Sequence, residues 1–306
     1  MLSEKFDARV HPADPPPDRD GIIAGAAGCR GLLTLVRDRV DAQMLEQLPE
    51  LRAVANYGVG YDNIDVGAAT ARGIVVTNTP DVLTAATADL ALALMLASTR
   101  RTGEGERLVR SGRPWAWTPT MMLGLELEGA TLGIVGMGRI GMAVARRALG
   151  FGLQVVYQAR SQHPEADALG ARRTEFDDLL AVADIVSLHV ALTDQTRHLI
   201  DERALRRMKP TAHLINTARG PVVDEAALTR ALGEGWIAGA GLDVYEREPR
   251  VEPGLLELEN VVLLPHLGSA TTWARSEMAR VAAANLIAAL GGSQPPNAVN
   301  PEVLTG

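Results

Sequence analysis

This sequence has almost no cysteine and lacks the long apolar runs of membrane spans and signal peptides. Cys29 is the single cysteine among 306 residues, so an internal disulfide is excluded and a reducing compartment is favoured. No charge-free apolar run reaches the length of a membrane span, and the start of the chain lacks the apolar region of a signal peptide. We therefore expect a cytoplasmic protein that does not enter a membrane.

Positive charge and metal-binding patterns are also lacking. The chain has 30 lysines and arginines against 37 acidic residues and a net charge of -7, so it offers no basic surface of the kind that binds nucleic acid. No group of histidine, cysteine or carboxylate residues has metal-ligand spacing, and no GxSxG nucleophile elbow occurs. The sequence thus predicts neither a metal site nor a nucleic-acid partner.

What the sequence does contain is a regular alternation of strand-like and helix-like segments. Its 47% apolar and 22% charged residues are typical of a folded globular protein, and 306 residues suffice for two domains. FDARVH at residues 6–11 could form a short strand, whereas the following proline-rich PADPPPDRDG predicts a loop. From Gly31 onward, GLLTLV, LRAVANYG and IVVTNTP are strand-like, with the helix-like DAQMLEQLP and DVGAATARG between them. This order is typical of a parallel sheet with helices on both faces, in a small α/β domain that ends near residues 80–83.

A long helix predicted over residues 84–101 leads into a second, larger domain. It is apolar on most sides, which indicates burial between domains or between subunits. After an excursion at residues 101–129, strand and helix patterns alternate as in a doubly wound nucleotide-binding domain, and the helix at residues 271–292 is long enough to pack back on the first domain. The predicted domains are a discontinuous substrate domain of residues 1–83 and 268–306, and a dinucleotide-binding domain of residues 84–267.

The second domain opens with LGIVGMGRIG at residues 132–141, a strand that runs into a glycine turn and then a helix. In such a unit Gly136 allows the tight turn, Gly138 lets the backbone approach a pyrophosphate, and Gly141 lets the helix pack on the sheet. The helix N-terminus offers unpaired N–H groups and a positive dipole end to the phosphates. A glycine turn between strand and helix is common, but the strand LQVVYQAR follows this one, so the context favours a dinucleotide site.

Charged side chains follow three later strands, in the region beyond the carboxyl ends where doubly wound sheets bind ligands. Arg219 follows HLINTA, Asp243 follows WIAGAGL with Glu248 in the next loop, and His266 follows NVVLLP. A guanidinium can hold a substrate carboxylate, and a histidine paired with a carboxylate can donate a proton to an alkoxide. With hydride from a cofactor, this set would reduce a 2-oxo acid.

Each of these residues also has a plainer interpretation. Arg219 could be a solvated loop residue, Glu248 part of a surface turn, and His266 a histidine satisfied within the core. His189, at the end of the strand-like DIVSLH, could border the cofactor. The other histidines have no supporting context and are expected to be structural or exposed.

The residues after the strand LQVVYQAR predict which dinucleotide binds. An NAD-specific site needs an acidic residue about 20 positions beyond the last glycine. Counted from Gly141, that place holds Ala159, followed by Arg160 and Ser161. A carboxylate there would repel a 2′-phosphate, whereas an arginine and a hydroxyl can bind one. The sequence therefore predicts NADPH in preference to NADH, unless Arg160 is merely solvated.

Six motifs together resemble, in order and spacing, the D-isomer-specific 2-hydroxyacid dehydrogenase family. They are NYGVGYDNID, TADLALALML, LGIVGMGRIG, NTARGPVVDEAAL, AGAGLDVYEREP and PHLGSAT, within residues 31–292, and they are most similar to the glyoxylate/hydroxypyruvate reductases. The resemblance implies an α/β fold in which a Rossmann-like doubly wound parallel sheet is inserted into a smaller flavodoxin-like substrate domain. It also implies an NAD(P)H-dependent reductase of small 2-oxo acids such as glyoxylate and hydroxypyruvate.

The same resemblance implies roles for individual residues. Arg219 would clamp the substrate, His266 would be the acid/base with Glu248 as its partner, and the backbone of Val59 and Gly60 would hold the substrate carboxylate. The implied cofactor contacts are Gly136, Gly138, Arg139, Ile140, Gly141, Arg160, Ser161, Thr217, Asp243 at the nicotinamide amide, and Gly268. By analogy with the dimers of the family we expect a homodimer, in which Trp117 lines the neighbouring subunit's active site or only packs at the interface.

Two other functions belong to chains of this kind. A phosphoglycerate dehydrogenase-like enzyme is disfavoured by the residues after the LQVVYQAR strand. A dinucleotide-sensing interaction protein of the corepressor type is disfavoured by the intact set of Arg219, Glu248 and His266.

The chain departs from the family pattern near its start. The family has a strand and a helix ahead of the region that matches residues 6–11, where this chain has five residues. That strand would be central in the sheet of the small domain. We therefore expect either that the protein starts further upstream or that its small domain is compromised.

Overall fold

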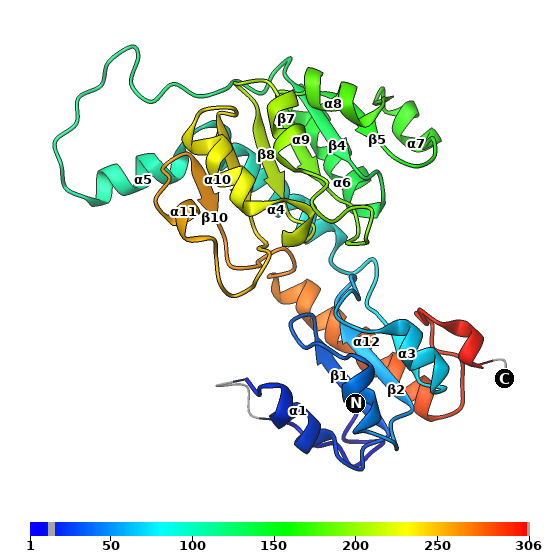
Figure 1. Ribbon diagram of the computed structural model, residues 1–306. Coiled ribbons are helices and arrows are strands. Elements are labelled where there is room, and N and C mark those ends of the chain that lie inside the picture. The colour runs from blue at the N-terminus through cyan, green and yellow to red at the C-terminus, as the bar shows by residue number, and fades with distance from the viewer. Residues whose placement is uncertain (12–15, 305–306) are drawn as a thin grey trace. The chain divides into compact units, whose positions relative to one another are not determined.

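The structure is a computed structural model that describes residues 1–11 and 16–304. The chain divides into two compact units: Met1–Leu83 together with Thr271–Gly306, and Thr84–Ala270. In Figure 1 the blue and the red ends of the chain both lie in the first unit. The first unit is therefore discontinuous, and the second is built from the middle of the chain.

The first unit holds a three-stranded parallel sheet in the order β1-β2-β3. Its elements are α1 (Arg19–Ala26), β1 (Gly31–Leu35), α2 (Ala42–Glu46), β2 (Ala53–Tyr57), α3 (Val66–Ala71), β3 (Val75–Thr77), α12 (Thr272–Leu290) and the 3-10 turn η3 (Pro301–Leu304). One face of the sheet packs on α1, α2 and α3 through a cluster that includes Met44, Leu45 and Ala69. The other face packs on α12 through Ala282 and Leu286. The last helix thus completes the core of the first unit.

Aspartates determine where the short helices of this unit begin. Asp18, Asp41 and Asp65 precede α1, α2 and α3, and each accepts a hydrogen bond from a backbone N–H in the first turn, at 2.9, 3.0 and 2.8 Å. Such caps satisfy N–H groups that have no partner inside the helix, and each contributes about 1 kcal/mol to stability.

The predicted strand at residues 6–11 is wrong. These residues have no strand pairing, and β1 pairs only with β2. An extended segment without a neighbouring strand gains no ladder hydrogen bonds, so its apolar pattern alone does not make it a strand. Of the predicted loop that follows, residues 12–15 lie outside the described residues, and its end is helical because α1 begins at Arg19.

The second unit holds a seven-stranded parallel sheet in the order β10-β9-β8-β7-β4-β5-β6. Its strands are β4 (Thr131–Val135), β5 (Gln154–Gln158), β6 (Arg172–Arg173), β7 (Ile185–Leu188), β8 (His213–Asn216), β9 (Gly239–Leu242) and β10 (Val261–Leu263). Its helices are α4 (Thr84–Thr99), α5 (Thr102–Arg110), α6 (Arg139–Ala148), α7 (Pro164–Ala168), α8 (Phe176–Val182), α9 (Glu202–Arg207), α10 (Glu225–Gly233) and α11 (Pro253–Leu256), with 3-10 turns η1 (Leu149–Phe151) and η2 (Gly220–Val222). The predicted α/β class with parallel sheets and flanking helices is confirmed.

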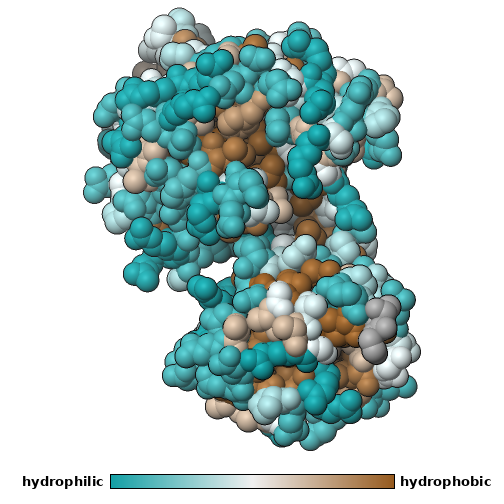
Figure 2. All heavy atoms as spheres, turned by 45° about the vertical axis from the view of Figure 1, so that its right-hand side comes forward, coloured by the Kyte–Doolittle hydropathy of each residue, from teal (hydrophilic) through white to brown (hydrophobic). Residues whose placement is uncertain are grey.

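Helices cover both faces of this sheet, so its strands are largely buried, except for the exposed edge strand β6. One cluster joins α4 and α6 to the sheet through residues such as Met95 and Val144, and the other joins α8, α9 and α10 through residues such as Leu179, Leu205 and Leu228. The outer faces of the helices carry charged side chains, and hydrophilic residues cover most of the face of this unit seen in Figure 2. Burial on both faces explains why strands such as β4 and β7 are mostly apolar without alternation.

The predicted excursion at residues 101–129 contains a helix that the sequence did not indicate. α5 occupies its first part, and Arg101 in front of it forms an ion pair with Glu104 at 2.7 Å. The chain after α5 has no regular structure until β4, and Figure 1 shows this segment extending away from the sheet. None of the helices in the described part of the chain has the length and apolarity needed to cross a bilayer.

His213 links the sheet to α4 inside the second unit. Its ring is buried at the start of β8, and Nδ1 is hydrogen-bonded to Ser98 Oγ at 2.8 Å. Burial lowers the pKa of His213 from 6.5 to about 4, because the charged form loses its hydration. The ring is therefore neutral in the folded protein at neutral pH.

Acidification should destabilise the second unit through this histidine. In the unfolded chain His213 takes up a proton near pH 6.5, whereas in the folded protein it does so only near pH 4. The contribution of the neutral His213 to the free energy of unfolding is therefore fully present above pH 6.5 and is lost as the pH falls from 6.5 to about 4. The loss is on the order of 3 kcal/mol. Chemical denaturation of the wild type and of His213→Gln, at intervals from pH 8 to pH 4, should show a weaker acid dependence for the variant. Equal dependence in both, after correction for any difference at pH 8, would contradict this assignment.

Candidate active site

Three charged side chains lie at one edge of the large sheet. Arg219, Glu248 and His266 follow β8, β9 and β10, which are adjacent and parallel, so their carboxyl ends meet at the same edge. The chain between these strands is helical or returns to the opposite edge. Residues far apart in sequence are therefore brought to one place by the strand order.

His266 and Glu248 form a hydrogen-bonded pair. Nδ1 of His266 lies 2.8 Å from Oε2 of Glu248, and the backbone N–H of Tyr245 donates to the other carboxylate oxygen at 3.1 Å. Partial burial raises the pKa of Glu248, but the hydrogen bond and charge of His266, the Tyr245 N–H and the charge of Arg219 together lower it below its usual value. Glu248 is thus an anion that orients the imidazole, whose Nε2 is left for a substrate.

The backbone of His266 is held in an unusual conformation. Its φ is +56°, in the left-handed region that a residue with a side chain rarely adopts, and its N–H donates to the carbonyl oxygen of Asp243 at 2.9 Å. Asp243 is buried, and its two carboxylate oxygens accept the N–H groups of Leu267 and Gly268 at 2.6 and 2.8 Å. Burial raises the pKa of Asp243 above its usual value, although the two N–H donors act to lower it. Asp243 therefore fixes the turn that orients His266. The carbonyl oxygen of Gly268 accepts a hydrogen bond from the hydroxyl of Thr87 at 3.1 Å.

Arg219 is held by its own turn. Its Nη1 donates to the carbonyl oxygen of Ala218 at 2.8 Å, and its carbonyl oxygen accepts from the side chain of Asn216 at 3.0 Å. Oδ1 of Asn216 accepts the N–H of Ala218 at 3.0 Å, so one side chain satisfies both ends of the turn. The guanidinium is half-buried, and its charge acts on Glu248.

Two glutamates that the sequence did not single out join the Arg219 turn to the loop carrying Glu248. The N–H of Glu225 donates to Oε1 of Glu246 at 3.1 Å, and the N–H of Glu246 donates to Oε1 of Glu225 at 2.6 Å. Beside them, a β-carbon on Gly220 would overlap the backbone of Tyr245 and Glu246. We call this reciprocal pair the Glu225–Glu246 clasp. The acidic residue at the first position of α10 is the only sequence signal that could have pointed to it.

The clasp contains a buried carboxyl group. Glu225 is 6% exposed, and burial raises its pKa, as do the nearby carboxylates of Glu246 and Glu252, while the N–H groups of the same two residues lower it. Oε1 of Glu246 also lies 3.0 Å from Nε2 of His198. A buried acceptor that engages a backbone donor resists displacement, because breaking the bond leaves a desolvated group without a partner.

The glycine turn between β4 and α6 has the close contacts that the sequence predicts. Gly136 has a φ of +97°, and a β-carbon there would lie 2.6 Å from the carbonyl oxygen of His189. A β-carbon on Gly141 would overlap the carbonyl oxygen of Gly136, whereas one on Gly138 would meet nothing within 4 Å. Gly138 begins α6 without a side-chain cap, and Arg139 and Ile140 form its first turn. The space beside Gly138 and the uncapped N-terminus fit a dinucleotide phosphate.

Other residues on this edge also fit a dinucleotide. Thr217 is 8% exposed, and its hydroxyl has no hydrogen-bond partner among the described residues. An unsatisfied buried hydroxyl at a strand end is suited to a ligand. The backbone carbonyl of His189 lies against Gly136, and its ring Nε2 is 2.8 Å from Ser187 Oγ. Burial lowers the pKa of His189 to about 4, so it is neutral near pH 7.

The loop after β5 carries the residues predicted to select the cofactor. Arg160 and Ser161 are both exposed on it, directly after the half-buried Ala159. No hydrogen bond or ion pair joins Arg160 to another residue within the described ranges 1–11 and 16–304. The guanidinium is thus available to a ligand.

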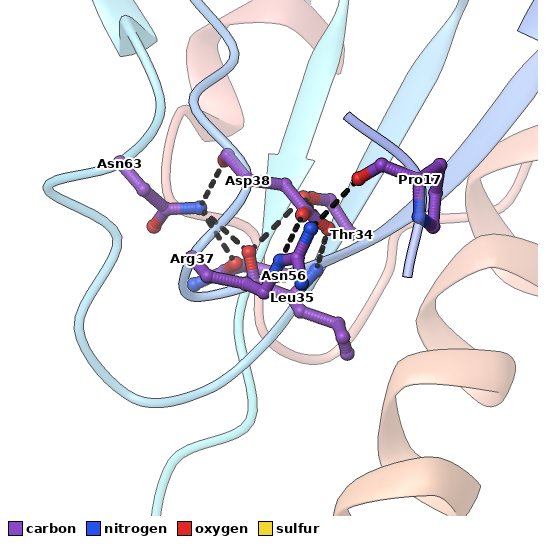
Figure 3. A network of polar contacts seen from close by, with 7 residues as sticks. All are labelled: Pro17, Thr34, Leu35, Arg37, Asp38, Asn56 and Asn63. Carbon is purple, nitrogen blue, oxygen red and sulfur yellow. Dashed lines mark hydrogen bonds and ion pairs between the residues drawn. The ribbon is translucent and has the colours of Figure 1, made fainter. Parts of the chain in front are cut away.

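In the first unit, Val59 and Gly60 follow β2 in a loop that side-chain amides hold in place. Asn78 donates to the carbonyl oxygen of Val59 at 2.8 Å, and Asn56 donates to that of Gly60 at 2.6 Å. Asn63 in turn donates to Asn56 Oδ1 at 3.2 Å within the polar network of Figure 3. The N–H groups of Val59 and Gly60 donate to no residue in the described part of the chain. Both carbonyls are engaged and both N–H groups remain, which suits an anion such as a carboxylate.

Trp117 lies at the surface of the second unit. Its side chain is 78% exposed, in the irregular segment after α5 that extends from the sheet. Trp115 at 57% and Leu123 at 65% are exposed in the same segment. Among the described residues, no three histidine, cysteine, aspartate or glutamate side chains are grouped so that they could hold a metal ion.

Comparison with known proteins agrees with this geometry. Residues 92–268 match the family described as D-isomer specific 2-hydroxyacid dehydrogenase, NAD binding domain. The chain is 52% identical over 311 residues to the glyoxylate reductase of Thermococcus litoralis, covering 100% of this chain and 94% of that protein.

Solved structures show the same similarity. The TT0316 protein of Thermus thermophilus has a TM-score of 0.86 at 48% identity, covering 92% of this chain and 89% of that one. The NADPH-dependent glyoxylate/hydroxypyruvate reductase of Sinorhizobium meliloti, solved in complex with NADP and malonate, has a TM-score of 0.84 at 38% identity, covering 93% and 88%.

The sequence motifs, the strand order and the glycine turn therefore agree with the similarity over the whole length of the chain. The predicted resemblance is confirmed. The protein belongs to the D-isomer specific 2-hydroxyacid dehydrogenase family and is an oxidoreductase that uses a nicotinamide dinucleotide.

Proposed function

We propose that this enzyme reduces small 2-oxo acids, glyoxylate and hydroxypyruvate among them, to the corresponding 2-hydroxy acids with NADPH. The observation that carries the proposal is the 2.8 Å pair of His266 and Glu248 at the strand edge that also presents Arg219. The names of the related glyoxylate reductases support the choice of substrate.

In this proposal each residue has a separate task. Arg219 binds the substrate carboxylate through its planar fork and polarises the adjacent carbonyl group. His266 donates a proton from Nε2 to the carbonyl oxygen as that oxygen becomes an alkoxide, and Glu248 keeps the ring oriented and stabilises its positive charge. The dinucleotide supplies the hydride when bound. The N–H groups of Val59 and Gly60 bind the substrate carboxylate.

The cofactor site in this proposal includes all the predicted contacts. Gly136, Gly138 and Gly141 with the first turn of α6 hold the pyrophosphate, Thr217 and Gly268 line the site, and Asp243 binds the nicotinamide amide. Arg160 and Ser161 bind a 2′-phosphate, which supports NADPH over NADH. The Sinorhizobium meliloti relative is NADPH-dependent by name.

We further propose a cytoplasmic homodimer. Trp115, Trp117 and Leu123 are large, exposed and close together in sequence, which is unusual for a surface that faces only water. Trp117 then lines the active site of the neighbouring subunit or packs at the interface, and the two roles stay open. The single cysteine agrees with a reducing compartment.

The proposal predicts a defined substrate and cofactor preference. Initial rates with a panel of 2-oxo acids, each with NADPH and with NADH, should be highest for glyoxylate or hydroxypyruvate with NADPH. A clear preference for NADH would remove the proposed role of Arg160. Dinucleotide binding without turnover of any 2-oxo acid would overturn the proposed reaction.

His266→Ala should nearly abolish reduction while the cofactor still binds. Loss of a general acid lowers the rate by about 10²–10⁴-fold. The measurements are kcat with glyoxylate and the dissociation constant of NADPH, which should stay within about twofold of wild type because the phosphate turn is untouched. His11→Ala, at a histidine of the other unit, serves as the control, and retained turnover in His266→Ala would exclude the assigned role.

Glu225 should affect catalysis through the clasp. In Glu225→Ala the N–H of Glu246 loses its acceptor and the loop that carries Glu248 is released, so kcat should fall by up to about 10²-fold with little change in cofactor affinity. Glu225→Gln keeps an oxygen acceptor and should restore most of the activity. Equal loss in both variants, or no loss in Glu225→Ala, would show that the clasp does not position Glu248.

A further inference from the structure

A second arginine lies beside the loop that is proposed to select the cofactor. β6 is the edge strand next to β5, and its last residue, Arg173, pairs with Tyr157. The Nε and Nη2 atoms of Arg173 donate to the carbonyl oxygen of Ala159 at 3.2 and 3.0 Å. Its side chain therefore crosses the carboxyl end of β5, immediately before Arg160.

The loop on which Arg160 and Ser161 lie is tied down on its far side. The buried Tyr157 accepts the N–H of His163 at 3.0 Å and donates its hydroxyl to Asp167 Oδ1 at 2.9 Å. Gln162 donates to the other oxygen of Asp167 at 2.8 Å. The hydrogen bonds from Arg173 to Ala159 and from His163 to Tyr157 fix the loop on both sides of Arg160 and Ser161. These two residues are therefore held close to β6.

The charge on this edge is not neutralised by the protein. Arg160 and Arg173 form no ion pair with any carboxylate in residues 1–11 and 16–304, in contrast to arginines such as Arg146 and Arg147 of α6, which pair with Glu165 and Asp89. Arg173 uses Nε and Nη2 on the carbonyl oxygen, so the N–H groups of Nη1 remain for another acceptor. The Arg173 guanidinium contacts the residue just before Arg160, and two arginines this near to each other without counter-charge favour a dianion.

We propose that Arg173 is a specificity-determining residue that binds the 2′-phosphate of the dinucleotide together with Arg160. The inference rests on the proposed preference for NADPH and adds a residue to it. The neighbouring Arg172 does not share the role, because successive residues of a strand point to opposite faces. It provides a matched control, since it is also exposed and carries the same charge.

The test measures binding of two fragments without turnover. Isothermal titration with 2′,5′-ADP, which carries the phosphate, and with 5′-AMP, which lacks it, should show tighter binding of 2′,5′-ADP to the wild type. In Arg173→Gln the dissociation constant of 2′,5′-ADP should rise about tenfold, the worth of one charge-assisted hydrogen bond, and that of 5′-AMP should not change. Arg172→Gln should bind both fragments like the wild type.

The other outcomes decide against the inference in distinguishable ways. Unchanged 2′,5′-ADP binding in Arg173→Gln, or an equal loss in Arg172→Gln, removes the role of Arg173 and leaves the proposed function intact. Equal weakening of both fragments means that Arg173 acts only by holding Ala159. If the wild type does not distinguish the fragments, the proposed NADPH preference itself fails, and with it the role of Arg173.

Discussion

Parallel hydrogen bonding between β8, β9 and β10 is the constraint on which the candidate active site depends. β8 pairs with β9, beginning with His213 opposite Gly239, and β10 pairs with β9, ending with Leu263 opposite Leu242. The carboxyl ends of the three strands therefore cannot separate without breaking the backbone hydrogen bonds between them. Arg219, Glu248 and His266 follow directly from those ends. Glycines at 239 and 241 keep the middle strand close to its neighbours, since a β-carbon at either would crowd His213 or Leu94.

Buried carboxyl groups determine the conformation of the loops that follow these strands. Asp243 accepts two backbone N–H groups and shapes the turn of His266, and Glu225 accepts the N–H of Glu246 and holds the loop of Glu248. Burial raises the pKa of both groups, which shows that their positions are unfavourable for charge unless donors are supplied. The positions of the catalytic side chains therefore depend on residues that need not touch substrate.

Much of this organisation could be predicted from the sequence. Apolar runs separated by glycine and proline predict the strands of the large sheet, and the spacing of Gly136, Gly138 and Gly141 predicts the phosphate turn, because both patterns reflect local geometry. The strand-end positions of Arg219, Glu248 and His266 predict that they gather at one edge, since parallel strands share a direction. The family and its reaction class follow from the same residues, and the comparisons confirm them.

The tertiary structure decided what depends on contacts between distant segments. The strand predicted at residues 6–11 is wrong because pairing, not local pattern, makes a strand. α5 was missed because none of its nine residues is buried, so the helix leaves no core-facing pattern in the sequence. The Glu225–Glu246 clasp joins residues 21 apart, and Arg173 reaches Ala159 from a two-residue edge strand. A sequence pattern predicts which face of a segment is buried, because that depends on the spacing of its own apolar residues. The Glu225–Glu246 and Arg173–Ala159 hydrogen bonds depend instead on which distant segments the fold brings together.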